Sequence, residues 1–304
     1  MLACLVTGAT GSIGRALARR LQGRASHLRL LARTRRGDLP IDAEQVTGDF
    51  ADLASMERAF AGMEAVFLYT PARPDARLLQ VAARQGVRHV VLLSSASVVK
   101  VAPEAANPVA ERHRGMERHV QQAGFDATVL RPDTLATNCL AWADEIRRHA
   151  RVSVPYPSSL RNPIHEDDVA HVAARAMLDP GAFGGRSFLL TGPQPLSIQA
   201  QVEAIGHAIG QSIECRQITA QAAIEGMSRG PSAMTVEVAA RLVAYMEKTT
   251  RERPALTADF LDVIGQPPRR FAEWAVDHAH AFRPTAVPTL PASPARPDAG
   301  PPTD

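Results

Sequence analysis

The stretch TGATGSIG, residues 7–14, decides the fold of this 304-residue chain. It directly follows the apolar run LACLV at residues 2–6, which is typical of a buried strand. In a strand–turn–helix unit that binds a dinucleotide, Gly8 permits the tight turn, Gly11 lets backbone N–H groups approach the pyrophosphate, and Gly14 lets the helix pack on the sheet. The motif therefore predicts a phosphate cradle. The alternative is a glycine-rich turn that binds no ligand.

Apolar runs typical of strands alternate with helical patterns over residues 1–150. The predicted strands are 2–7, 27–32, 44–47, 65–69, 87–93 and 127–130, and the predicted helices are 14–22, 53–61, 75–85 and 108–122. This alternation predicts an α/β protein with a doubly wound parallel sheet, the Rossmann fold. Its ligand crevice lies beyond the carboxyl ends of the strands.

The alternation becomes irregular after residue 150. A strand at 152–154, a helix at 165–178 and a strand at 187–191 are expected to complete the sheet, giving a dinucleotide-binding domain over residues 1–191 with its core in 1–150. Residues 192–282 are expected to form a small, mainly helical substrate lobe, with helices at 197–209, 236–245 and 271–282. Residues 283–304 hold seven of the 23 prolines and predict a disordered tail.

The composition narrows the function classes. A net charge of +3 carried by scattered arginines indicates a solvated surface and no nucleic-acid partner. Cys4, Cys139 and Cys215 lie far apart, so neither a disulfide framework nor a metal site is expected. No apolar run reaches the roughly 18 residues of a membrane helix, and the N-terminus lacks a signal-peptide pattern, so we expect a cytoplasmic protein without a membrane partner.

The end of the second predicted strand carries Arg33, followed by Arg35 and Arg36. In NAD-binding chains an acidic residue at this place, about 20 positions after the glycines, binds the ribose 2′-hydroxyl. A guanidinium instead suits the geometry of a 2′-phosphate. The sequence therefore predicts NADP(H) in preference to NAD(H). The alternative is that these arginines only face solvent.

Two further loops follow strands at the same edge of the predicted sheet. Asp49 and Phe50 follow the third strand and are expected to bracket the adenine. Tyr69, Thr70 and Pro71 follow the fourth and are expected to line the path to the nicotinamide. Both loops could also be ordinary turns.

Several motifs in a fixed order extend this interpretation. They are TGATGSIG (7–14), GDF (48–50), VLLSSAS (91–97), VLRP (129–132), PIHEDDVA (163–170), LTGPQPLS (190–197) and GQPPRRFAEWA (265–275). Together they resemble the atypical short-chain dehydrogenases/reductases of the NmrA-like group over roughly residues 2–282. The resemblance implies a Rossmann domain that binds NADP(H) and a small C-terminal substrate lobe. Thr10, Ser12, Ile13 and Pro132 complete the expected cofactor contacts.

The chain departs from the wider family in its proton relay. Catalytic members carry a Tyr-x-x-x-Lys pair, but the only lysines here are Lys100 and Lys248, and no tyrosine precedes either at that spacing. Ser95 matches the family's substrate-polarising serine position. His113, in the helix that should carry the pair, is a candidate proton donor. The alternative for His113 is an exposed histidine on a polar helix face.

Two hypotheses follow. The first is an NADPH-dependent reductase of a small organic acceptor such as a quinone, enone or imine, in secondary metabolism, because such acceptors need less proton-relay help than an isolated ketone. The second is a non-catalytic NADP(H)-binding redox sensor that acts through a regulatory protein partner. The missing Tyr-Lys pair favours the sensor, whereas Ser95 and the substrate lobe favour the enzyme. We favour the reductase.

Overall fold

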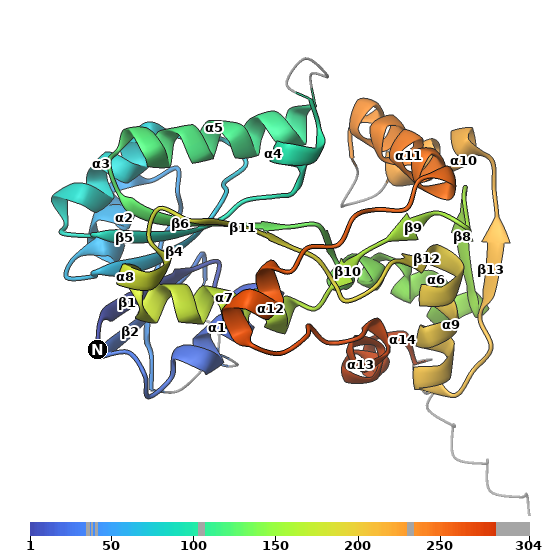
Figure 1. The fold of residues 1–304 in the computed structure, drawn as a ribbon, viewed down its shortest axis with the longest axis horizontal. Coiled ribbons are helices and arrows are strands. Elements are labelled where there is room, and N and C mark those ends of the chain that lie inside the picture. Colours follow the sequence, from blue (N-terminus) through green and yellow to red (C-terminus); the bar gives the residue numbers. More distant parts are fainter. Residues whose placement is uncertain (35–36, 38, 40–41, 103–106, 230–233, 284–304) are drawn as a thin grey trace, which may run out of the picture.

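The computed structural model of the chain describes residues 1–34, 37, 39, 42–102, 107–229 and 234–283. Two predicted features, Arg35 with Arg36 and all of the predicted tail except Arg283, lie outside these residues. A central sheet with helices on both faces adjoins a mainly helical part, which lies on the right in Figure 1.

Seven parallel strands form the central sheet, in the order β11-β6-β5-β4-β1-β2-β3. Their bounds are β1 (Ala3–Thr7), β2 (His27–Ala32), β3 (Glu44–Thr47), β4 (Ala65–Tyr69), β5 (His89–Leu93), β6 (Asp126–Pro132) and β11 (Ser187–Leu190). The order reverses between β1 and β4, which is the switch point where this architecture binds ligands. The predicted doubly wound Rossmann sheet is confirmed.

Helices cover both faces of the sheet, as Figure 1 shows, and each face has its own buried core. One layer contains α1 (Ser12–Leu21), α7 (Glu166–Leu178), α8 (Pro180–Phe183) and α12 (Asp259–Ile264). The other contains α2 (Leu53–Phe60), α3 (Ala76–Arg84) and α5 (Pro108–Gln122), and α4 (Ser97–Lys100) precedes α5. Because helices pack on both faces, the carboxyl ends of the parallel strands lie side by side at one edge of the sheet.

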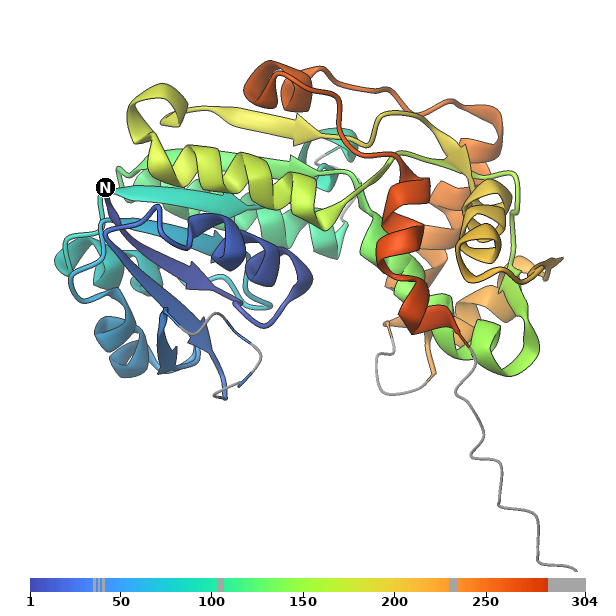
Figure 2. The same ribbon diagram turned by 90° about the horizontal axis from the view of Figure 1, so that it is seen from below.

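A third buried cluster forms the C-terminal lobe. Its elements are η2 (Ala136–Trp142), α6 (Ala143–His149), β8 (Arg151–Val154), α9 (Ile198–Ile209), β13 (Glu214–Gln217), α10 (Ala220–Met227), α11 (Val236–Arg251), α13 (Phe271–Asp277) and α14 (Ala279–Phe282). At its centre, Trp274 is fully buried and stacks on Phe271, with ring centroids 5.1 Å apart. Figures 1 and 2 both place α13 beside α9. The expected mainly helical lobe is confirmed.

The expectation that residues 152–154 return to the central sheet is wrong. Strand β8 pairs with β13 in a separate two-stranded sheet, where Val152 lies opposite Cys215. Val152 and Val154 are buried and alternate with half-exposed residues, the pattern of a strand buried on one face. In the central sheet, β1, β4 and β5 instead bury nearly continuous runs. The predicted division of the chain at residue 191 remains a prediction.

Two helix ends also differ from expectation. The helix predicted at 271–282 breaks at His278, whose Nδ1–H donates to the Trp274 carbonyl at 2.9 Å, beside the backbone N–H of the same residue at 3.0 Å. Asp167 and Asp168, which resemble N-capping residues, do not cap α7. His165 caps it, because its Nδ1 accepts the Asp167 N–H at 3.1 Å. Asp167 pairs with Arg20 at 2.6 Å.

Two short ladders join the lobe to the sheet. Strand β7 (Thr134–Leu135), directly after β6, pairs with β10 (Pro163–Ile164). Strand β9 (Leu160–Arg161), directly before β10, pairs with β12 (Leu196–Ser197). These ladders place residues 159–162 between the carboxyl edge of the sheet and the lobe.

Candidate functional site

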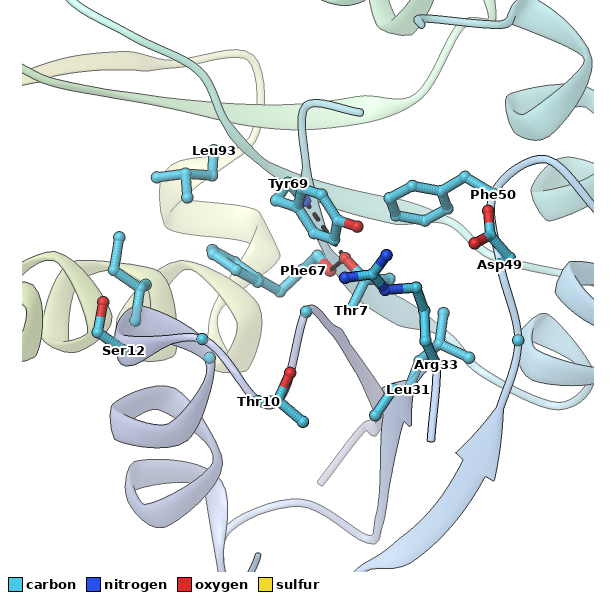
Figure 3. Close-up of a pocket in the computed structure, with 16 residues that line it drawn as sticks. Thr7, Thr10, Ser12, Leu31, Arg33, Asp49, Phe50, Phe67, Tyr69 and Leu93 are labelled. Atoms are coloured by element: carbon cyan, nitrogen blue, oxygen red, sulfur yellow. Dashed lines mark hydrogen bonds between the residues drawn. The ribbon is translucent and has the colours of Figure 1, made fainter. Parts of the chain in front are cut away.

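A pocket of about 370 Å³ opens at the carboxyl ends of strands β1 to β4 (Figure 3). It is lined by Thr7, Gly8, Thr10, Gly11, Ser12, Ile13, Gly14, Leu31, Ala32, Arg33, Gly48, Asp49, Phe50, Phe67, Tyr69 and Leu93. The structure thus brings together most of the residues predicted to bind the cofactor. Thr70, Pro71 and Pro132 are not among the lining residues.

The glycine turn has no room for side chains. Gly8 adopts φ +63°, and a Cβ there would lie 2.8 Å from Cδ1 of Tyr69. A Cβ at Gly14 would collide with the carbonyl oxygen of Gly8, the atom that also accepts the Gly11 N–H at 2.9 Å. Helix α1 begins behind Gly11 with no side-chain cap and no acidic residue in its first turn. The turn can therefore admit a phosphate close to the positive end of the helix.

An aromatic wall borders the pocket beside the glycine turn, where the Tyr69 ring packs on Gly8. The ring centroids of Phe50 and Tyr69 lie 4.8 Å apart. Figure 3 shows the two side chains next to each other. Thr7 fixes Tyr69, because its Oγ1 accepts the Tyr69 N–H at 3.2 Å and donates to the Phe67 carbonyl at 2.8 Å. Partial burial raises the pKa of Tyr69, so its hydroxyl stays protonated at neutral pH. The wall offers flat apolar surface to an aromatic ring.

Arg33 follows β2 and extends into the pocket in Figure 3. Its positive charge acts on the Tyr69 hydroxyl, which places the guanidinium near the aromatic wall. Asp49, after β3, holds its own loop, because its Oδ1 accepts the Ala51 N–H at 2.9 Å. The pocket therefore presents a cation directly after the second strand, where a dinucleotide places its adenosine ribose.

His113 is buried, with 9% of its surface exposed, so the alternative of an exposed helix histidine is wrong. Its Nδ1 lies 3.0 Å from Oγ1 of Thr70, whose hydroxyl donates to the Leu93 carbonyl, so His113 is the donor. Arg112 donates to Nε2 at 3.3 Å. Burial and Arg112 lower the pKa of His113 to about 4. The imidazole is neutral at pH 7, and it positions the loop after β4.

Ser95 lies in the loop after β5, two residues beyond Leu93 of the pocket wall. Its Oγ accepts hydrogen bonds from the Ser97 N–H at 3.2 Å and the Ser97 hydroxyl at 3.0 Å. Its own proton is therefore available to a ligand. Ser94 secures the same loop by donating to Glu117, which pairs with Arg131 at 2.6 Å.

A polar group that the sequence analysis did not identify lies at the same edge of the sheet. Asp133, directly after β6, pairs with Lys100 at 2.6 Å and accepts from Asn162 at 3.4 Å. Asn162 also donates to the Ala255 carbonyl at 2.7 Å. The sequence did contain an indication that Asp133 lies at the functional edge of the sheet, because it occupies the first position after a strand. Its partners could not be identified, since they come from distant segments.

In the part of the chain that the structure describes, the His, Cys, Asp and Glu side chains form no group that could hold a metal ion. No helix there combines the length and the apolar character that crossing a membrane requires.

Comparison with known proteins places these features in a family. A family profile described as NAD(P)H-binding matches residues 8–180. The (4-alkanoyl-5-oxo-2,5-dihydrofuran-3-yl)methyl phosphate reductase of Streptomyces griseus is 33% identical and covers 92% of this chain and 99% of its own. The NAD(P)H azoreductase of Xenophilus azovorans is 28% identical, covering 91% and 98%.

A solved structure agrees in fold. The triphenylmethane reductase of a Citrobacter species, crystallised with NADP(H), gives a TM-score of 0.73 at 17% identity and covers 91% of this chain and 100% of its own. The chain belongs to the NAD(P)H-binding family, within the atypical short-chain dehydrogenases/reductases of the NmrA-like group, and it is an oxidoreductase. The resemblance expected from the motifs is confirmed.

Proposed function

We propose that the protein is an NADPH-dependent reductase of a small conjugated acceptor, such as a quinone, an enone or an imine. The observation that carries this proposal is the pocket itself, in which Arg33 and an uncapped glycine turn lie at the switch point of the sheet. A nucleotide with a pyrophosphate and a 2′-phosphate meets opposite charge at both places.

The residues of this chain fit the dinucleotide along its whole length. The backbone of residues 8–14 would hold the pyrophosphate and Arg33 the 2′-phosphate, while Asp49 and Phe50 would bracket the adenine. Tyr69 would lead toward the nicotinamide, with Thr70, Pro71 and Pro132 farther along the same edge. When bound, NADPH supplies the hydride. The protein then has to orient the acceptor and handle a proton.

Ser95 is the proposed group that polarises the acceptor, because its hydroxyl proton can point to an acceptor oxygen while Ser97 holds the Oγ in place. His113 was the expected proton donor, but a pKa of about 4 leaves it neutral, with its N–H directed to Thr70. We therefore assign His113 to positioning. A conjugated acceptor suits this arrangement, since it spreads the charge that hydride transfer creates and can take its proton from water.

The names of the relatives support the same class of acceptor. The name of the Streptomyces griseus enzyme describes an unsaturated lactone that bears an acyl group and a phosphate ester, which is a conjugated acceptor. The Xenophilus azovorans enzyme is named an azoreductase. Relatives named as reductases favour the enzyme over the sensor.

The test is to follow loss of NADPH absorbance with three acceptors: a naphthoquinone, a conjugated unsaturated lactone and an azo dye. We expect turnover with at least one of them and a preference for NADPH over NADH of about 10-fold or more, the strength of a charge-assisted hydrogen bond. If the protein binds NADPH tightly but oxidises it with none of the three acceptors, the reductase hypothesis is contradicted and the sensor hypothesis is favoured.

A further inference from the structure

Arg161 of β9 is a buried cation with neutral hydrogen-bond partners. Only 6% of its surface is exposed. Its Nη1 donates to the Leu160 carbonyl at 3.3 Å and to Oγ1 of Thr249 at 2.9 Å, and its guanidinium lies 4.5 Å from the ring centroid of Tyr245. None of these partners carries a negative charge. Burial lowers the pKa of Arg161, and it outweighs the opposite influence of Tyr245 and of the Asp133 carboxylate, which is shared with Lys100.

Several other arginines of this protein that are partly buried have carboxylate partners. Arg20 pairs with Asp167 at 2.6 Å, Arg29 with Glu44 at 2.7 Å, and Arg131 with Glu117 at 2.6 Å. Arg161 is more deeply buried than these, yet its Nη2 has no hydrogen-bond partner among the described residues. An unpartnered charged nitrogen in the interior is unfavourable, and such groups are concentrated at functional sites.

Asn162 gives a second, independent observation. It is fully buried, and its Oδ1 also lacks a partner among the residues that the structure describes. Its Nδ2 reaches Asp133, which is paired with Lys100. Two adjacent residues therefore have unused hydrogen-bonding atoms at the junction between the sheet and the lobe.

The position of this junction favours a ligand. The pairing of β10 with β7 brings residues 159–162 beside Asp133, at the carboxyl edge of the sheet. From the lobe side, α11 covers the same place with Tyr245 and Thr249. Ligands of this architecture bind beyond that edge. The charged groups that meet here are Lys100, Asp133 and Arg161, so one positive charge is left over.

We propose that Arg161 binds an anionic group of the acceptor, a carboxylate or a phosphate ester, at the junction of β9 and α11. The inference rests on the proposed reductase activity, to which it adds a substrate class. Nη2 donates to an anionic oxygen, while the Tyr245 ring and Thr249 keep the guanidinium in place. The Tyr245 side chain is partly exposed, so this side of the junction is accessible from solvent. Arg161 is then a specificity residue, separate from the groups that contact the reacting atoms.

The test compares a naphthoquinone with its sulfonate derivative as acceptors for the full chain with NADPH. In Arg161→Gln, we expect KM for the sulfonate to rise about 10- to 100-fold, the strength of a hydrogen bond between charged groups. We expect little change in kcat and little change for the neutral quinone. Arg251→Gln is the matched control, because it removes the same charge from an exposed position on α11. Equal effects on both quinones would overturn the proposal.

Two further measurements keep the proposal testable. Thr249→Asp places a carboxylate beside Arg161 and should abolish the preference for the sulfonate even if Arg161→Gln fails to fold. Inorganic phosphate should raise the melting temperature of the NADPH-saturated protein and should not do so in either variant. If neither quinone is reduced but phosphate still stabilises only the parent protein, the reductase proposal fails and the anion site stands. If both quinones are reduced and phosphate acts equally on all variants, the anion site fails alone.

Discussion

The dinucleotide pocket and the junction around Arg161 lie at the same edge of the sheet but are built differently. The pocket uses one contiguous turn, residues 7–14, and short loops directly after β2, β3 and β4. Much of its capacity to bind a phosphate comes from backbone N–H groups, which are accessible because the glycines have no side chains. The junction draws Lys100, Asp133, Arg161 and Tyr245 from four separate segments, and its chemistry lies in side chains. Local sequence therefore specifies the first region, and only the tertiary fold specifies the second.

The strands show which structural features the local sequence predicts and which it does not. The bounds predicted for the strands at 27–32, 44–47 and 65–69 agree with β2, β3 and β4. Strands β2 and β4 lie between two helix layers and read as short apolar runs with turn residues after them, whereas β3, at the edge of the sheet, is mostly polar. Strand β8 was assigned to the wrong sheet, since a run of four residues does not identify its partner. Helix α11 extends six residues past the predicted end at Tyr245, because residues 246–251 contain nothing that ends a helix.

The residues of the candidate site also differ in how far the sequence alone predicts their roles. The position of Arg33 after a strand was enough to predict its place in the pocket. The role of His113 could not be predicted, because its pKa depends on burial and on Arg112. Tyr245 has no Lys at the family spacing, and its neighbour Arg161 is 84 residues earlier in the chain. Pairs of this kind become visible only in the folded structure.

The largest expected effect tests whether the pocket depends on backbone alone. Gly14→Ala adds a single methyl group, which would collide with the Gly8 carbonyl oxygen. We expect loss of stability of about 1–3 kcal/mol from overpacking, and a larger loss of NADPH affinity because the turn itself must shift. Calorimetric titration with NADPH and a melting curve measure the two effects separately.

Gly115→Ala is the matched control for that substitution. Gly115 lies within α5, and a Cβ there would meet no atom within 4 Å. We expect a gain of about 0.5–1 kcal/mol in stability from helix propensity and unchanged NADPH affinity. If Gly14→Ala behaved like this control, the close approach in the glycine turn would not be needed for binding.

The second prediction sharpens the assignment of Arg33, the one cationic side chain among the described residues that line the pocket. Arg33→Asp should weaken NADPH binding and strengthen NADH binding, shifting the ratio of affinities by about 10- to 100-fold, because a carboxylate repels the 2′-phosphate and accepts a ribose hydroxyl. Competitive titration with both nucleotides measures the ratio. Arg88→Asp makes the same charge change at the amino end of β5, where we expect no shift. A ratio that moves equally in both variants would mean that overall charge sets the preference.

The smallest effect uses pH to separate the pocket from another tertiary contact, the one between α13 and α7. Glu166 at the start of α7 is buried and accepts from Trp274 Nε1 at 3.0 Å, while Nε2 of His278 lies 2.8 Å from it. Burial alone would lower the pKa of His278, but the bond to Glu166 raises it above its ordinary value. A raised pKa adds stability that is complete below about pH 6.5 and is lost as the pH rises through the folded-state pKa.

We therefore expect the melting temperature to fall by about 2–4 °C between the acid and alkaline sides of that titration, the shift typical of 1 kcal/mol in a protein of this size. His278→Gln should remove the slope, and His280→Gln, two residues on and exposed, should keep it. NADPH affinity should stay constant over the same range, because His278 belongs to the contact between α13 and α7 and not to the pocket lining. If affinity followed the melting temperature, the lobe contact and the pocket would be coupled, and the separation between a locally specified site and a tertiary one would fail for this protein.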